Sequence, residues 1–210
     1  ARPAAGFGWT VEHEINNQLT FRQKARYSTG HWDQRTLVWG SLGEDDRTIS
    51  RTVTEARSET RQAAIDNQLE YRLNALGGEH VLLGGVDFHY RRVNDRSSYG
   101  ARANPIDWRD PVYGNVLIIG DPRGQSEGIS RVRQTGVYLQ DQATLGRLHM
   151  QAGLRYDWAK NESTDLLADS TDKFDSKALT GRLGFLYEME SGFSPYASYS
   201  TSFEPVTQVA

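Results

Sequence analysis

The stretch Leu148-His-Met-Gln-Ala-Gly-Leu-Arg-Tyr-Asp-Trp158 alternates between apolar and polar side chains. Successive side chains of a β-strand point to opposite faces, so this pattern gives one strand an apolar face and a polar face. The apolar face consists of Leu148, Met150, Ala152, Leu154, Tyr156 and Trp158, and it ends in two aromatic residues. Aromatic residues are enriched where a barrel strand crosses a membrane–water interface. The stretch therefore predicts a strand of a transmembrane β-barrel.

The same period of two recurs along the chain. A second clear case is Leu179, Gly181, Leu183, Phe185, Tyr187 and Met189. We predict eight strands, at roughly 7–15, 18–29, 47–74, 80–94, 131–145, 147–159, 177–189 and 194–204. The residues expected to face lipid include Leu148, Met150, Leu154, Tyr156, Leu183, Phe185 and Tyr187. The residues expected to face inward include Arg155, Asp157 and Arg182.

The predicted connections alternate between short and long. Short ones lie at residues 16–17, 76–79, 145–146 and 190–193, and long ones lie near residues 29–46, 94–130 and 160–176. Bacterial outer-membrane barrels have short periplasmic turns and long outer loops. A soluble β-sandwich gives no reason for such strict alternation. The fold class is therefore all-β: an antiparallel transmembrane β-barrel segment of about eight strands.

Residues 48–73 test this scheme, because two strands there would invert every later turn. As one strand, its odd positions stay in phase, with Ile65, Leu69, Tyr71 and Leu73 facing lipid. The earlier odd positions are charged: Arg51, Glu55, Arg57, Glu59 and Arg61. A lipid-facing arginine is costly at the middle of a membrane. This half of the strand is therefore predicted to project above the bilayer.

The composition excludes several other classes of protein. The mean hydropathy is −0.65, and no run approaches the roughly 18 apolar residues of a membrane helix. The 210 residues include no cysteine, which excludes disulfides and thiolate metal sites, and the net charge of −3 gives no reason to expect nucleic-acid binding. The five histidines lack metal-ligand spacing. Both ends look like cuts through a longer protein.

Five segments resemble strands of a known family. They are Gly136-Val-Tyr-Leu-Gln-Asp-Gln142, Gly153-Leu-Arg-Tyr-Asp-Trp158, Pro195-Tyr-Ala-Ser-Tyr-Ser-Thr-Ser-Phe-Glu-Pro205, Phe21-Arg-Gln-Lys-Ala-Arg-Tyr27 and His80-Val-Leu-Leu-Gly-Gly-Val-Asp-Phe88. In order and spacing they resemble TonB-dependent siderophore receptors, and in particular the ferric hydroxamate branch that takes ferrichrome and ferrioxamine. The resemblance implies a 22-stranded barrel with an N-terminal plug and a TonB-contacting segment. Residues 1–210 would be a middle portion of that barrel domain, with the plug absent.

The resemblance also implies a function. The whole protein would be a bacterial outer-membrane receptor that captures a ferric siderophore of the hydroxamate class and imports it with energy relayed by TonB. It would be no enzyme and would need no cofactor; the ferric siderophore would be its cargo. Its partners would be that siderophore, the TonB complex through the missing N-terminal part, and outer-membrane lipid, with no nucleic acid.

Two alternatives stay open from the sequence. One is a complete, small eight-stranded outer-membrane barrel with a structural or adhesion role. Such a barrel must pair its first and last strands, and it usually ends on an aromatic residue. This chain ends at Val209-Ala210. The other is a barrel enzyme acting on lipid, which needs a serine and histidine pair at the interface, and none is evident.

Aromatic residues in or beside the two longest predicted loops are the candidates for ligand contact: Trp108, Tyr113, Tyr99, Trp32 and Trp39. Aromatic walls suit a compact, neutral iron chelate with an organic backbone. Trp108 and Tyr113 lie in Ile106-Asp-Trp-Arg-Asp-Pro-Val-Tyr113, which resembles the family's Asn-Pro-Val-Tyr loop, with Asp110 in place of the asparagine. The alternative role for all five is to pack the loops against one another.

Overall fold

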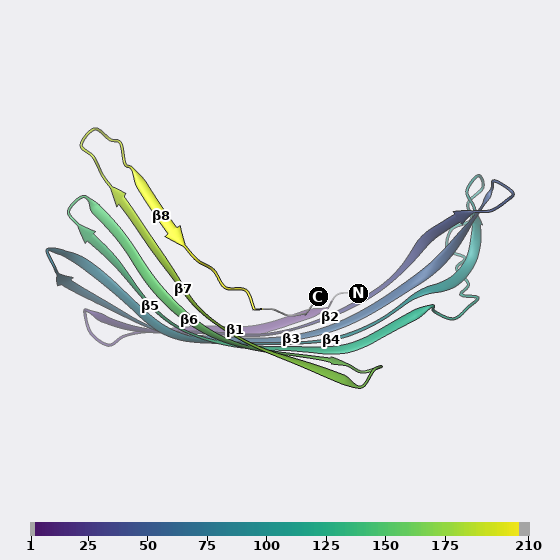
Figure 1. The fold of residues 1–210 in the computed structure, drawn as a ribbon, viewed down its shortest axis with the longest axis horizontal. Coiled ribbons are helices and arrows are strands. Elements are labelled where there is room, and N and C mark those ends of the chain that lie inside the picture. The colour runs from purple at the N-terminus through teal and green to yellow at the C-terminus, as the bar shows by residue number, and fades with distance from the viewer. Residues whose placement is uncertain (1–2, 206–210) are drawn as a thin grey trace.

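The computed structural model describes residues 3–205 as a single antiparallel sheet of eight strands. The strands are β1 (Ala4–Glu14), β2 (Leu19–Leu42), β3 (Thr48–Ala75), β4 (Gly78–Asp107), β5 (Gly124–Leu145), β6 (Leu148–Asp165), β7 (Ser170–Tyr187) and β8 (Tyr196–Ser200). The sheet bends into a trough, and the outer ends of β2, β3 and β4 curve toward its concave side (Figure 1). The predicted fold class and the number of strands are confirmed.

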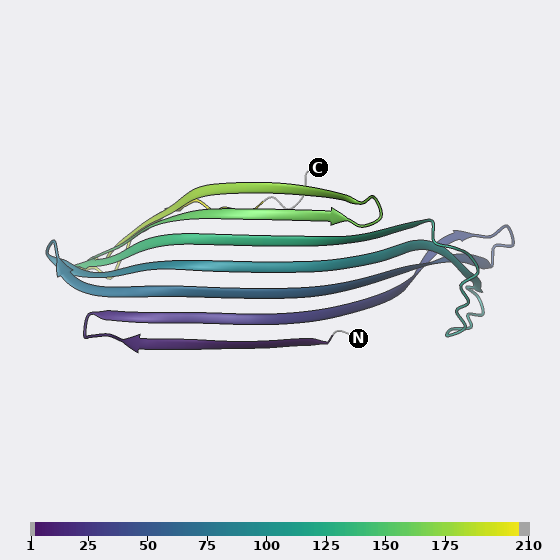
Figure 2. The ribbon, with the colours of Figure 1, turned by 90° about the horizontal axis from the view of Figure 1, so that it is seen from below.

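Each strand pairs with its neighbours in the sequence, in the order β1 to β8 (Figure 2). Within residues 3–205, β1 pairs only with β2 and β8 pairs only with β7. The sheet is therefore open at both edges, and the closed eight-stranded barrel considered above is wrong for this structure. The chain end Val209-Ala210 lies outside the described residues. No helix within residues 3–205 is long and apolar enough to cross a membrane.

The predicted division of faces is confirmed. Leu154 and Leu183 are well exposed on one face, whereas Arg155 and Asp157 lie on the other, where Arg155 reaches from β6 to Asp87 on β4. Tyr138 of β5 likewise reaches Asp66 on β3. Side chains that bridge two strands in this way must converge, as they do on the inside of a curved sheet. The polar face is therefore the concave, lumenal face, and the apolar face is convex.

The convex face carries two groups of aromatic residues. The register aligns Phe88 with Trp158 through Thr135, and Tyr27 with Tyr90 through Ala63. Nearer the short turns lie Tyr71, Phe185 and Tyr187. Girdles of aromatic residues at both interfaces flank the apolar band of outer-membrane barrels, which is about 25 Å tall. The band of this sheet therefore lies between the two groups.

The strands are longer than predicted, and this corrects the loops. β2 runs to Leu42 rather than to residue 29, β4 to Asp107 rather than 94, and β6 to Asp165 rather than 159. The predicted loop at 160–176 is mostly a hairpin of β6 and β7, and β8 covers only Tyr196–Ser200. A polar stretch looks like a loop in sequence, but two polar strands still pair if their backbone groups bond to each other. β3, with 28 residues, exceeds the roughly 9–11 that cross a bilayer.

The prediction that residues 48–73 form one strand is correct, since β3 covers Thr48–Ala75 without a break. The short turns also fall where they were expected. Leu76 and Gly77 at the β3–β4 turn have positive φ angles of 50° and 82°, which a two-residue hairpin of this type requires. A small buried cluster of Val53, Ala101 and Ala103, with Leu37 against it, lies in the outer part of the sheet.

Candidate functional site

The outer end of the sheet lies opposite the short turns and is built by the long strands β2, β3 and β4. On their convex face, opposite charges stand at directly paired positions of β2 and β3: Asp33 with Arg57 and Arg35 with Glu55. The Arg57 Nε to Asp33 Oδ1 distance is 2.8 Å and the Arg35 Nη2 to Glu55 Oε1 distance is 2.5 Å. Directly opposed charges on neighbouring strands favour their pairing. These two ion pairs therefore help to keep β2 and β3 paired at the outer end of the sheet.

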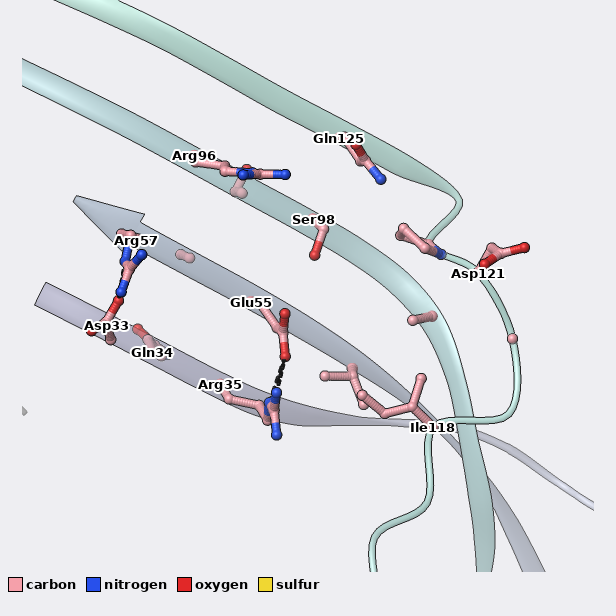
Figure 3. A pocket seen from close by; sticks show the side chains of 16 residues that line it. Asp33, Gln34, Arg35, Glu55, Arg57, Arg96, Ser98, Ile118, Asp121 and Gln125 are labelled. Carbon is pink, nitrogen blue, oxygen red and sulfur yellow. Dashed lines mark hydrogen bonds and ion pairs between the residues drawn. The ribbon is translucent and has the colours of Figure 1, made fainter.

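A cavity of about 850 Å³ opens on the same part of the molecule (Figure 3). Its walls carry the two ion pairs, together with Arg96, Asp121 and Gln125, and its apolar lining includes Val53, Ala101 and Ile118. Most of its charged groups point to one another across the strands, as Figure 3 shows for Arg35 and Glu55. None of the five predicted aromatic residues lines this cavity.

The structure does not gather those five residues in one place. Trp32 and Trp39 lie within β2 and Tyr99 lies within β4, so the prediction that they occupy loops is wrong. Trp32 alternates onto the lumenal face and Trp39, 65% exposed, onto the convex face. The ring of Tyr99 lies over Gly124, its partner on β5. Tyr113 is 75% exposed in the loop between β4 and β5.

Trp108 lies at the tip of the outer end, just after β4. Its indole Nε1 donates to the carbonyl oxygen of Asp46 at 3.0 Å, and its backbone nitrogen donates to the carbonyl of Arg47 at 3.1 Å. The Arg109 guanidinium stacks over the indole at 5.1 Å from the ring centroid. About half of the residue remains exposed. Trp108 therefore both packs against the β2–β3 turn and presents a face to solvent.

The β2–β3 turn has its own polar anchor in Asp45. Its carboxylate accepts hydrogen bonds from the backbone nitrogens of Arg47 and Thr48, at 3.0 and 2.8 Å, and from the Thr48 hydroxyl. The Thr48 hydroxyl and these backbone groups lower the pKa of Asp45 to about 2. Arg47 also forms an ion pair with Asp107 at the end of β4, and this hydrogen bond lowers the pKa of Asp107. We call Asp45, Arg47, Thr48, Asp107 and Trp108 the tip clasp.

The lumenal face carries a second polar group, centred on Arg155. This guanidinium bonds Asp87 through Nη1 at 2.5 Å and Nη2 at 3.0 Å, and bonds Asp157 through Nε at 2.8 Å and Nη2 at 2.7 Å. Gln134 donates to Asp157 at 2.8 Å. The side chains of Asp87 and Asp157 are only 6% and 3% exposed. Buried carboxylates require such partners, so Arg155 ties β4 and β6 together across β5.

Glycines make room for this lumenal network. A Cβ atom on Gly85 would lie 2.4 Å from the ring of Tyr138 and 2.8 Å from the carbonyl oxygen of Asn67. The ring therefore lies flat over the backbone of β4, and its hydroxyl donates to Asp66 at 2.8 Å. The network thus depends on a missing side chain as well as on charged ones.

The sequence reasoning placed Arg155 and Asp157 on the correct face but missed the lumenal network and the tip clasp. A usable signal existed for each. Asp87, Arg155 and Asp157 all occupy lumenal positions of their strands, and Asp45 stands three residues before Thr48 at a turn, where it can accept from the backbone. Within the described chain, no group of three or more histidine, aspartate or glutamate side chains could hold a metal ion.

Comparison with known proteins agrees with this geometry. The family described as TonB dependent receptor-like, beta-barrel matches residues 2–209. The ferrioxamine receptor of Yersinia enterocolitica is 33% identical over 205 residues, which is 95% of this chain and 29% of that protein. The ferrichrome outer membrane transporter/phage receptor of Escherichia coli K12 is 30% identical over 96% of this chain and 30% of its own length. The chain thus spans less than a third of these relatives.

Solved structures share the fold. The siderophore receptor PiuA of Acinetobacter baumannii superposes with a TM-score of 0.79 at 17% identity, over 98% of this chain and 33% of that one. The ferric citrate transporter FecA superposes with a TM-score of 0.72 over 98% of this chain and 28% of that one. The matched family is one of receptors and transporters rather than enzymes. The chain belongs to the TonB-dependent receptor β-barrel family of the bacterial outer membrane and forms part of the wall of such a barrel.

Proposed function

We propose that the full-length protein binds a ferric siderophore of the hydroxamate class at its outer mouth and imports it with energy transmitted by TonB. The observation that carries the proposal is the 30–33% identity, over nearly the whole chain, to receptors named for ferrioxamine and ferrichrome. The TonB complex would be engaged by parts of the protein outside this chain, and outer-membrane lipid would surround the convex face.

The outer end of the sheet suits this role. Trp108 presents about half of its surface at the tip, and Tyr113 is largely exposed in the adjoining loop. Trp32 and Tyr99 alternate onto the lumenal face, toward the space that a ligand would cross. Flat aromatic faces bury a neutral chelate without leaving charges unpaired. We therefore keep Trp108 and Tyr113 as the first candidates for ligand contact, with Tyr99, Trp32 and Trp39 after them.

Uptake by whole cells tests the import. Cells that carry the full-length receptor as their only siderophore receptor would be given radioactive iron bound to ferrioxamine B, ferrichrome or a catecholate. We expect uptake of a hydroxamate complex that disappears when TonB is deleted. Uptake of the catecholate alone would contradict the proposed class, and uptake that is equal without TonB would contradict the mechanism.

Binding to the purified receptor tests the site. Loss of an aromatic side chain at the centre of a binding site costs about 2 kcal/mol or more, which is roughly thirtyfold in affinity. We expect Trp108→Ala to raise the Kd by about this factor, and Trp39→Ala, on the convex face, to change it less. An unchanged Kd for Trp108→Ala would make Trp108 a packing residue only.

A further inference from the structure

The regular pairing of β3 with β4 ends at the tip clasp. The last pair in the register is Thr48 with Asp107. Beyond it the chain runs through residues 108–123, a loop that carries exposed apolar side chains, among them Val112 and Tyr113 at 68% and 75% exposure. Long loops in compact folds are usually functional, and exposed apolar side chains that lie together mark interaction sites. What fixes its conformation therefore matters for any ligand that meets it.

The loop is held at two places. Its return limb is fixed by Asn104, whose Nδ2 donates to the carbonyl of Asn115 and whose Oδ1 accepts from the backbone nitrogen of Leu117, both at 2.8 Å. The backbone nitrogen of Ile119 donates to the carbonyl of Arg102 at 2.8 Å. The return limb thus continues the sheet alongside the outer part of β4.

The departing limb is fixed by Arg47. Its guanidinium pairs with Asp107, and its carbonyl oxygen accepts from the backbone nitrogen of Trp108. The other oxygen of Asp107 accepts from the backbone nitrogen of Arg109 at 2.9 Å. The Arg47 guanidinium therefore holds Asp107 at the point where the loop leaves the sheet, and the backbone carbonyl oxygens of Arg47 and Asp46 hold the backbone and the indole of Trp108.

We propose that Arg47 is a positioning residue for siderophore binding: through Asp107 it holds the departing limb of the β4–β5 loop and keeps Trp108 in its binding orientation. This inference rests on the proposed function. Ligand binding to a loop that is already ordered avoids the entropic cost of ordering it. Release of the clasp should thus weaken binding without changing the barrel wall.

The test uses the full-length receptor in three variants, Arg47→Ala, Arg47→Lys and Arg131→Ala. Arg131 is the matched control, because it forms a partly exposed ion pair with Glu162 on neighbouring strands and does not line the cavity of the candidate site. A nitroxide on Val112→Cys reports loop mobility; residues 1–210 contain no other cysteine, and any cysteine elsewhere in the full-length receptor is first replaced by serine. Binding of ferrioxamine B and ferrichrome gives the Kd. The heat-modifiable band on a gel verifies barrel assembly.

We expect Arg47→Ala to mobilise the label and to raise the Kd about threefold to fivefold, a modest change because the ion pair that it removes is partly exposed. Arg47→Lys, which keeps a cation near Asp107, should restore most of the loop order and most of the affinity, and Arg131→Ala should change neither. If Arg47→Ala does not assemble, Asp107→Asn removes the ion pair while keeping an acceptor for Arg109, and the same two changes are expected.

Two results would overturn the inference while leaving the proposed function intact: a label that stays immobile in Arg47→Ala, or a label that becomes mobile while the Kd is unchanged. A wild-type receptor that binds neither complex would overturn the proposed function, and the inference with it. The two failures are therefore distinguishable from the wild-type titration alone.

Discussion

Replacing Arg155 by methionine should destabilise the barrel more than any exposed charge substitution in this chain. The change removes the cation shared by Asp87 and Asp157, whose side chains are 6% and 3% exposed. Removing one partner of a buried ion pair costs about 3–5 kcal/mol. The Arg155 side chain is itself 31% exposed, so part of its charge is already screened by water. We therefore expect a loss of about 2–3 kcal/mol.

Urea unfolding of the full-length receptor, reconstituted in lipid vesicles, gives the free energy of unfolding from the midpoint and slope of the transition. The matched control is Arg147→Met, because the Arg147–Glu190 pair is 50% and 79% exposed and should contribute only about 0–1 kcal/mol. Converting both aspartates to asparagine in the Arg155→Met background should recover part of the loss, since no unpaired charge then remains buried. Equal midpoints for Arg155→Met and Arg147→Met, or a further loss in the triple variant, would refute the reasoning.

Three further outcomes are expected. Leu154→Arg, on the convex face near the middle of the apolar band, should lower the free energy of unfolding by about 2–4 kcal/mol. Gln151→Arg, on the lumenal face of the same strand, should leave it nearly unchanged. Equal losses for the two variants in urea unfolding would contradict the assignment of faces. Gly85→Val should reduce the yield of heat-modifiable barrel, because a Cβ there would lie 2.4 Å from a tyrosine ring and 2.8 Å from a backbone oxygen. Gly84→Val is the control, since a Cβ on Gly84 would meet nothing nearer than 3.8 Å. Equal yields of the two variants would count against the lumenal packing. The pKa of Asp45 is held at about 2, and a depressed carboxyl pKa gives stability that is lost only as the pH falls toward the folded-state value. Tryptophan fluorescence from the tip should therefore stay constant from about pH 7 to about pH 4; an Asp45-dependent transition within that range would show that the turn is not held as described.

The sequence was sufficient for the membrane-crossing part of the fold, because lipid imposes a strict period of two on each strand. The alternation in residues 148–158 predicted both the strand and its faces, and the charged odd positions of residues 51–61 lie on a single unbroken strand, as predicted. The outer boundaries were wrong by more than ten residues at β2 and β4. There polar side chains occur on both faces, so no simple alternation marks the strands, and their pairing involves partners such as Asp33 and Arg57, which are far apart in sequence.

Single residues of the polar networks carry a signal in the sequence, but their pairings could not be predicted, because the partners are far apart along the chain. The bond of Arg155 to Asp87 spans 68 positions, and the pairing of Arg47 with Asp107 spans 60. The first depends on the register of three strands and the second on the register of β3 with β4, which a single sequence does not state. Local chemistry, such as an aspartate before a turn, indicates one partner of such a contact, and the fold is needed to identify the other. The five candidate aromatic residues remain predictions, and only Trp108 and Tyr113 lie outside the strands.

The most direct test of the barrel wall is a nitroxide scan along β6 of the full-length receptor in lipid bilayers. Labels placed one at a time on residues 148–165 would be measured for collisions with oxygen, which concentrates in lipid, and with a polar nickel complex, which stays in water. The structure predicts that oxygen accessibility alternates with a period of two and peaks at Leu148, Met150, Leu154, Tyr156 and Trp158. It also predicts that this alternation fades beyond residue 159, where β6 leaves the lipid. A flat profile, or maxima at His149, Gln151, Arg155 and Asp157, would contradict the membrane orientation on which the whole account depends.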